Sequence, residues 1–231
     1  IQALDWLPSK NSGFRFNALD LRGRLTGKRL ALDNIDFRIF DGSVSGSASL
    51  TDQQRASIVG ELSFERVNLR KFGEALGIGG QFQGDANGKM RFSAPTQDLA
   101  VFATSLTADG SFVISRGSLG DIDFAEAVRR SSSKPVALGG ATRFDRLSGA
   151  FRMLPMGYRF SQLSLTAGLL HGNGYLNVTR NQQLNGQIAV AIGRNQGSVP
   201  IAIGGMLSAP LLNIVSLPRG PQNPGVPVEQ H

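Results

Sequence analysis

Residues 34–51 alternate between apolar and polar side chains on both sides of an Asp-Gly pair. Successive side chains of a strand point to opposite faces, and Asp-Gly is a frequent two-residue hairpin turn. A turn at Asp41-Gly42 therefore predicts a hairpin with one apolar and one polar face. The predicted pairs on the apolar face are Ile39 with Val44, Phe37 with Gly46, and Ile35 with Ala48.

The same alternation continues along most of the chain and predicts further antiparallel strands. It recurs over residues 58–64, 82–92, 100–114, 147–153, 163–178 and 184–192, with a hairpin near Gly168 in the 163–178 stretch. A two-residue turn must switch the parity of the apolar positions, but this parity is unchanged across Asp109-Gly110. We therefore expect Asp109-Gly110 to be a bend or bulge inside one long strand.

Two short helices are expected between the strands. The first follows Asn68, which can cap it, and ends at Gly77; its apolar face holds Leu69, Phe72 and Leu76. The second has Asp121 near its start and Pro135 beyond its end. Its predicted apolar face consists of Ile122, Ala125 and Val128.

The strand pattern repeats within the chain. Thr51 and Thr179 both open a polar loop with a Gln-Gln pair, which relates residues 33–66 to residues 160–192. Such repeats favour an extended sheet built from similar units. The predicted fold is mainly β: a long, curved antiparallel sheet of repeated meanders that forms a groove or partly open barrel, with two short helices. Residues 1–217 form a single domain, and the Pro-rich tail 218–231 is expected to be disordered.

The apolar face is the candidate binding site. Glycine recurs on this face, for example at Gly60, Gly88 and Gly149, and predicts strong curvature and space between the larger side chains. The candidate lipid-contacting residues are Ile35, Phe37, Ile39, Val44, Ile58, Leu62, Phe64, Phe82, Met90, Phe92, Phe102, Phe112, Ile114, Leu163, Leu165, Leu170, Leu176, Val178, Ile188 and Val190. The alternative is a closed core, in which two sheets, or one curled sheet with the helices as lids, exclude water.

The sequence offers no catalytic or metal-binding constellation. The only histidines are His171 and His231, cysteine is absent, and no GxSxG, GxGxxG or P-loop motif stands between a strand and a helix. Asp121, Asp123 and Glu126 are better explained as acids that stabilise the start of a helix. We therefore expect a protein that is not an enzyme and has no cofactor and no bound metal.

The chain is basic, with a formal net charge of +7, which favours anionic partners. Nucleic-acid modules place basic and aromatic side chains on one face, whereas here Lys89 and Arg91 point away from Met90 and Phe92. Nucleic acid is therefore not the expected partner. The candidates for binding anionic headgroups are basic residues in and after the second expected helix, and we call them the second basic group, after that helix. They are Arg129, Arg130, Lys134, Arg143 and Arg146.

Five segments in order resemble the C-terminal region of AsmA-like proteins of Gram-negative envelopes. They are "GSFVISRGSLGDIDFAEAVRR", "TRFDRLSGAF", "LTAGLLHGNGYLNV", "LNGQIAVAI" and "IGGMLSAP", within residues 106–210. The resemblance implies a periplasmic protein anchored in the inner membrane by parts outside this chain. It also implies a hydrophobic β groove that carries phospholipid and contributes to outer-membrane biogenesis.

Two other functions fit the sequence. One is an envelope scaffold with a closed core that docks a membrane protein. The other is a peripheral binder of anionic lipid or lipopolysaccharide that uses the second basic group. No apolar run reaches the length of about eighteen residues of a membrane helix, and the missing initiator Met predicts that the chain is part of a longer protein.

Overall fold

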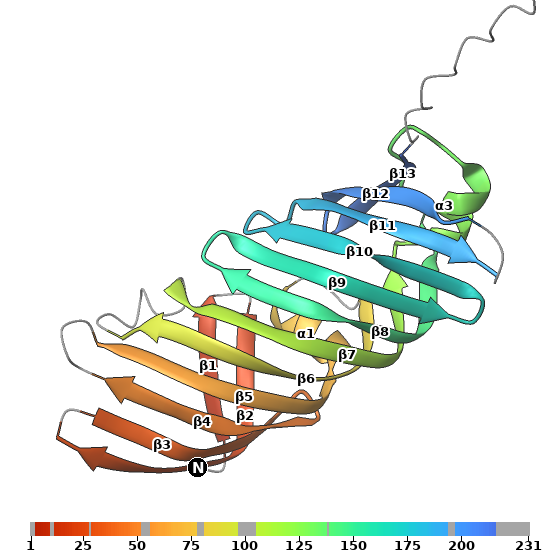
Figure 1. Cartoon of the computed structure of the whole chain (residues 1–231). Helices are drawn as coiled ribbons and strands as arrows, with labels where there is room; N and C mark the ends of the chain where they lie inside the picture. The colour runs from red at the N-terminus through yellow and green to blue at the C-terminus, as the bar shows by residue number, and fades with distance from the viewer. Residues whose placement is uncertain are drawn as a thin grey trace, which may run out of the picture.

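The computed structural model describes residues 3–9, 12–27, 29–51, 56–77, 81–96, 105–137, 139–193 and 197–215. Thirteen strands form one antiparallel sheet, in which each strand pairs with its neighbours in the sequence. The strands are β1 (Ala3–Ser9), β2 (Ser12–Thr26), β3 (Arg29–Ile39), β4 (Gly42–Thr51), β5 (Ser57–Asn68), β6 (Phe82–Pro95), β7 (Thr107–Gly120), β8 (Ala141–Leu154), β9 (Gly157–Ala167), β10 (Leu170–Thr179), β11 (Leu184–Ile192), β12 (Val199–Met206) and β13 (Ala209–Ile214). The helices are α1 (Leu69–Ala75) and α3 (Phe124–Arg130). The predicted fold class, a long curved antiparallel sheet with two short helices, is confirmed (Figure 1).

Cross-strand register lines up side chains of one kind in rows. One row joins Leu62, Met90, Gly110, Phe151 and Phe160 across β5 to β9. The adjacent row, on the other face, joins Glu61, Arg91, Asp109, Arg152 and Arg159. We call the side with the first row the apolar face and the side with the second row the polar face.

The predicted register of the first hairpin is wrong by two residues. The turn consists of Phe40 and Asp41, both at positive φ, and Gly42 already pairs with Ile39. Phe37 therefore faces Val44, and Gly46 faces Ile35. Gly42 is needed for a close approach of strands, since a Cβ there would lie 2.5 Å from the carbonyl oxygen of Glu65. A shift of two residues keeps every side chain on its predicted face.

Bulges change the parity of several strands. Between Leu32 and Ile35 the register of β3 against β4 slips by one residue. As a result, the apolar face holds even-numbered residues of β3, such as Leu32, before the slip and odd-numbered ones, such as Ile35, after it. Arg66 and Gln162 adopt positive φ at similar irregularities in β5 and β9. By contrast, Asp109-Gly110 lies inside the continuous strand β7, as predicted. Residues 100–104, which the alternation placed in this strand, lie outside the described residues.

Helix α1 has the predicted position and cap, but of its predicted apolar face Phe72 is exposed, and its buried residue is Gly73. Asn68 caps it, and the Asn68 side-chain oxygen accepts a hydrogen bond from the Lys71 N–H at 3.2 Å. Gly77 follows the helix at φ +71°. Phe72 of α1 is 37% exposed and packs edge-on against Phe40, with a ring-centroid distance of 5.8 Å.

Helix α3 matches its prediction in part. Asp121 lies two residues before the N-cap, which is Asp123, and the Asp123 side chain accepts the Glu126 N–H at 2.9 Å. Of the predicted apolar face, Ile122 is buried and Val128 packs against the core, whereas Ala125 is exposed. The buried residues within the helix are Phe124 and Ala127, which share the face of Val128 at helical spacing.

The end of the sheet at β13 is covered by the chain itself. After α3, Val136 exchanges two backbone hydrogen bonds with Leu212, at 3.0 and 2.9 Å. The N–H of Ile214 also donates to the carbonyl oxygen of Ser132. The loop after α3 therefore pairs with the last strand and protects its edge. The tail 218–231 lies outside the described residues.

Candidate functional site

The structure divides the candidate lipid-contacting residues into two groups. Those that are buried are Ile35, Ile39, Val44, Ile114, Leu165, Leu170, Val178, Ile188 and Val190. Those that stay partly exposed are Phe37, Ile58, Leu62, Phe64, Phe82, Met90, Phe92, Phe112, Leu163 and Leu176. Phe102 lies outside the described residues. The apolar face is thus filled in one part and open to solvent in another.

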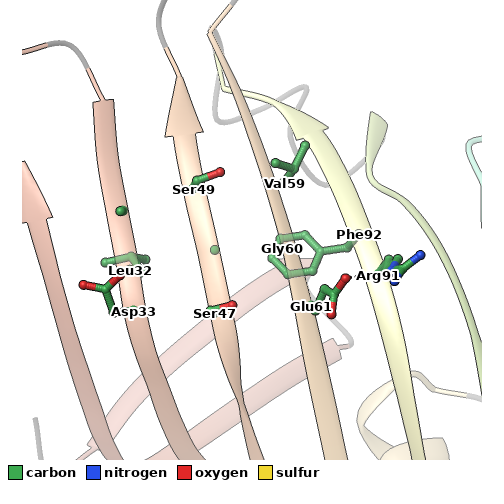
Figure 2. Close-up of a pocket in the computed structure, with 11 residues that line it drawn as sticks. Leu32, Asp33, Ser47, Ser49, Val59, Gly60, Glu61, Arg91 and Phe92 are labelled. Atoms are coloured by element: carbon green, nitrogen blue, oxygen red, sulfur yellow. Dashed lines mark hydrogen bonds and ion pairs between the residues drawn. The ribbon is translucent and has the colours of Figure 1, made fainter. Parts of the chain in front are cut away.

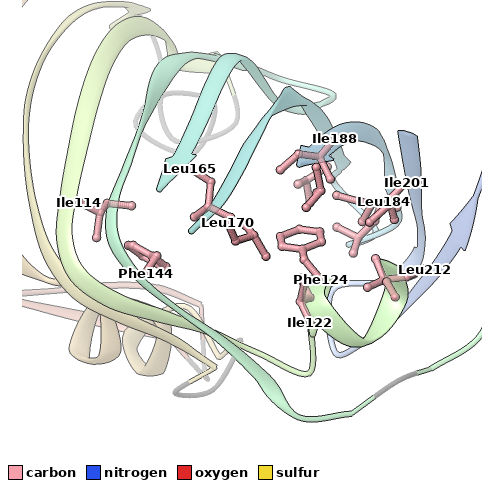
Figure 3. Close-up of a cluster of buried hydrophobic side chains, with 14 of the residues drawn as sticks. Ile114, Ile122, Phe124, Phe144, Leu165, Leu170, Leu184, Ile188, Ile201 and Leu212 are labelled. Carbon is pink, nitrogen blue, oxygen red and sulfur yellow. The ribbon is translucent and has the colours of Figure 1, made fainter. Parts of the chain in front are cut away.

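The filled part lies toward the C-terminal end of the sheet. Phe124 of α3 is 2% exposed and sits among Leu165, Ile201 and Leu212, with the strands curving around it (Figure 3). A buried hydroxyl holds this position, because Thr142 Oγ1 accepts the Phe124 N–H at 3.0 Å and donates to the Ile122 carbonyl oxygen at 2.7 Å. Phe124 is a key residue that the sequence prediction missed, since it placed Ala125 on the apolar face of the helix in place of Phe124.

Six candidate residues belong to this closed core. They are Ile114, Leu165, Leu170, Val178, Ile188 and Val190. The protein's own atoms cover their side chains, so contact with a ligand would require part of the core to open. The predicted alternative of a curled sheet with a helix as its lid therefore describes this end of the molecule.

The open part spans the middle of the sheet. The largest contacts of α1 are with β2, β5 and β6, and those of α3 are with β11, β12 and β13. The closest contacts between strands join hydrogen-bonded neighbours of the one sheet, and at its N-terminal end β1 and β2 run across β4 to β6 (Figure 1). Five large apolar side chains in this part remain only partly buried. They are Leu62, Met90, Phe112, Phe151 and Phe160. We call the surface that these five side chains form on the apolar face of β5 to β9 the open apolar strip; Ile114 and Leu165 of the same strands belong to the closed core.

Aromatic rings cover several glycines of the strip. A Cβ at Gly60 would lie 2.7 Å from the Phe92 ring, and a Cβ at Gly88 would lie 2.5 Å from the Phe64 ring. At Gly149 the Leu163 side chain would be 2.8 Å away. The prediction that these glycines leave space between larger side chains is therefore wrong. They let neighbouring side chains lie flat on the sheet, which makes the strip a smooth apolar surface.

Phe151 and Phe160 extend the strip beyond the residues predicted from the sequence. The rings of Phe112 and Phe151 have centroids 6.5 Å apart, and those of Phe112 and Phe160 are 6.1 Å apart. Phe151 follows the simple alternation of β8. Phe160 is out of phase with Leu163 because of the irregularity at Gln162, so alternation alone misses it.

A shallow hollow of about 470 Å³ lies over β3 to β6 (Figure 2). Its lining forms three successive cross-strand rows, and the two outer rows place their side chains, among them Ser47, Ser49 and Val59, on the polar face. Glu61 and Arg91 form an ion pair of 2.7 Å at its border. The hollow contains no pair of groups arranged for acid-base or nucleophilic chemistry.

The second basic group is partly neutralised within the protein. Arg129 and Arg130 both bind Glu126, with shortest distances of 2.6 and 2.5 Å. Their hydrogen bonds lower the pKa of Glu126 to about 2. Lys134 is exposed in the following loop, and Arg143 and Arg146 are exposed on β8. The five residues therefore do not act as five free positive charges.

Chemistry of other kinds has no support in the described residues. They contain no group of three or more His, Cys, Asp or Glu side chains that could hold a metal ion. His171 is an exposed residue of β10. None of the helices described has the length and apolar character needed to cross a membrane. No protein-family model, curated protein or solved structure matches this chain.

Proposed function

We propose that this chain is a non-enzymatic lipid-binding module that holds phospholipid acyl chains on the open apolar strip. The observation that carries the proposal is a row of apolar positions across five strands, in which Leu62, Met90, Phe151 and Phe160 flank Gly110 and remain partly exposed. Soluble proteins rarely leave such a surface without a partner. Each buried methylene of a lipid contributes about 0.8 kcal/mol, so contact area alone can hold an acyl chain without specific hydrogen bonds.

The resemblance of residues 106–210 to AsmA-like proteins supports the same function. In that setting the chain would work in the periplasm, as part of a parent protein anchored in the inner membrane, and would contribute to outer-membrane biogenesis. The open strip supplies the apolar β surface that such a role requires. The closed core around Phe124 would mark one end of this surface.

A pair of neighbouring residues on β6 tests the proposal. Met90 lies on the open apolar strip, and Lys89 points to the polar face of the same strand. We expect gently purified wild-type protein to carry phospholipid in native mass spectrometry. Met90→Glu should lower lipid occupancy at least about tenfold, since it places a charge among acyl chains, whereas Lys89→Glu should not change it.

The result also separates this function from its main alternative. An envelope scaffold is favoured by the closed core around Phe124, which needs no ligand. A wild-type chain that is folded but empty, and that takes up no added phospholipid, would refute lipid binding and favour the scaffold. Equal lipid occupancy in the Met90 and Lys89 variants, with both folded, would show that lipid does not bind to the strip.

A further inference from the structure

Exposed apolar side chains gather at one end of the strands. In a meander every second turn lies at the same end, so the turns β8–β9, β10–β11 and β12–β13 are neighbours. Large exposed apolar residues at these turns are Leu154, Met156, Tyr158 and Met206. Met156, at the tip of the β8–β9 turn, is 81% exposed. Together with Arg180 we call these residues the rim cluster.

Backbone hydrogen bonds join the three turns into one surface. The Arg180 N–H donates to the Met156 carbonyl oxygen at 3.0 Å, and the Leu207 N–H donates to the Gln182 carbonyl oxygen at 2.8 Å. A hollow of about 160 Å³ lies between Tyr158, Leu154 and Arg180. The exposed side chains are therefore presented by a connected framework and not by separate loops.

The charge at this end favours an anionic surface. The described turn residues 154–157, 180–183 and 206–208 contain Arg180 and no carboxylate. No ion pair with another described residue engages Arg180. At the opposite end of the strands, carboxylates such as Asp41 and Asp145 lie in or near the turns beside basic residues, and Asp41 is paired with Lys71 at 2.7 Å. Methionine, tyrosine and arginine side by side form a surface that suits the boundary between lipid headgroups and acyl chains.

The rim cluster continues into the open apolar strip. Tyr158 pairs with Met153 on β8 and lies two residues from Phe160 of the open apolar strip on β9, so both side chains are on the same face. Tyr158 therefore belongs to the apolar face and is also part of the rim. A lipid that leaves a bilayer at this rim would reach the apolar face without crossing a polar surface.

We propose that the rim cluster docks on the headgroup region of an anionic lipid bilayer, with Met156 and Tyr158 entering the interface and Arg180 contacting lipid phosphate. This docking rests on the proposed function, because it supplies the route by which acyl chains reach the strip. Its partner is a bilayer, whereas the ligand of the strip is a single lipid molecule.

Leu169 provides a matched control for Met156. It lies at the tip of the β9–β10 turn, at the opposite end of the strands, and is 68% exposed. We would measure co-sedimentation of the whole chain with phosphatidylcholine vesicles, with and without phosphatidylglycerol. Met156→Asp should lower the vesicle-bound partition about tenfold and Leu169→Asp should leave it unchanged, because only Met156 inserts. Arg180→Gln should remove most of the preference for phosphatidylglycerol and most of the salt dependence.

A second measurement does not depend on a loss of binding. Met156→Trp and Leu169→Trp each add a fluorophore at a turn tip. A blue shift on vesicle addition that is larger for Met156→Trp would support docking, and equal or absent shifts would overturn it. Equal effects of the two Asp changes on co-sedimentation would also overturn it.

Failure of docking is distinguishable from failure of lipid binding by the strip. If wild-type protein carries phospholipid in native mass spectrometry but does not bind either kind of vesicle, docking is refuted and the strip proposal stands. If Met156→Asp weakens vesicle binding while the chain carries no lipid and takes none up, docking is retained as a surface property and the strip proposal is refuted.

Discussion

Phe124 shows how much of the closed core depends on one side chain. It comes from a seven-residue helix, yet it lies in one buried cluster with side chains of β9 to β13. The Thr142 hydroxyl forms hydrogen bonds with two backbone groups at the start of the helix, the Phe124 N–H and the Ile122 carbonyl oxygen. Burial of a large ring and satisfied backbone groups together explain why a short helix can be held in place.

We expect Phe124→Ala to lower the free energy of unfolding by about 3–5 kcal/mol, because it removes a buried ring and leaves a cavity. Phe72→Ala on α1 is the control, since Phe72 is 37% exposed and should cost clearly less. Urea unfolding of both variants gives the comparison. Similar losses for the two variants would contradict the assignment of Phe124 as the centre of the core.

Helix α3 also carries a charge cluster whose effect depends on pH. Glu126 accepts hydrogen bonds from Arg129 and Arg130, which lower its pKa from 4.5 to about 2. A carboxylate whose pKa is lower in the folded state stabilises that state above its unfolded pKa. This contribution is lost as the pH falls from 4.5 to about 2.

We therefore expect the difference in unfolding free energy between wild type and Glu126→Gln to be constant near neutral pH and to shrink between pH 4.5 and 2. Chemical denaturation at a series of pH values measures it. High salt should reduce the difference, because the side chains of Arg129 and Arg130 are exposed. A difference that does not change over this pH range would exclude Glu126 as the responsible group.

Alternation predicted the elements well where strands are regular. It located the strands from β3 to β11 and both helices, since faces and caps depend on neighbouring residues. It did not predict β1, β2, β12 or β13. It also missed the slip between Leu32 and Ile35 and the phase change at Gln162, which arise from contacts between strands. The turn at Asp41-Gly42 was misplaced because the close approach to Glu65 that requires glycine comes from a strand later in the chain.

The sequence predicted on which face of the sheet each candidate residue lies, but not how deeply its side chain is buried. Parity places Met90 and Leu165 on the same apolar face, and the structure agrees. Whether a position is open or filled depends on where α3 packs, which local pattern does not encode. Leu165 is therefore a core residue, whereas Met90 remains partly exposed.

At the scale of the whole molecule, the sheet joins two regions of different stability. The buried cluster around Phe124 draws residues from β6 to β13, whereas the buried apolar residues of β3 and β4 are Ile35, Ile39, Val44 and Ala48. A single sheet layer protects its amides less than a layer packed on a core, since solvent reaches its hydrogen bonds from the uncovered side. Local opening should therefore be most frequent near β2 and β3.

Hydrogen exchange followed by mass spectrometry tests this division and the position of the lipid together. In lipid-free protein, we expect the amides of β10 to β12 to exchange most slowly and those of β2 and β3 most quickly. A short-chain phospholipid should then slow exchange in β5 to β9, where acyl chains would cover the open apolar strip, and change β11 to β13 little, because the core around Phe124 already covers them. If lipid slows amide exchange only near the rim cluster, the bound lipid is assigned to the docking surface. If lipid slows exchange equally in all strands, it stabilises the fold without occupying the strip.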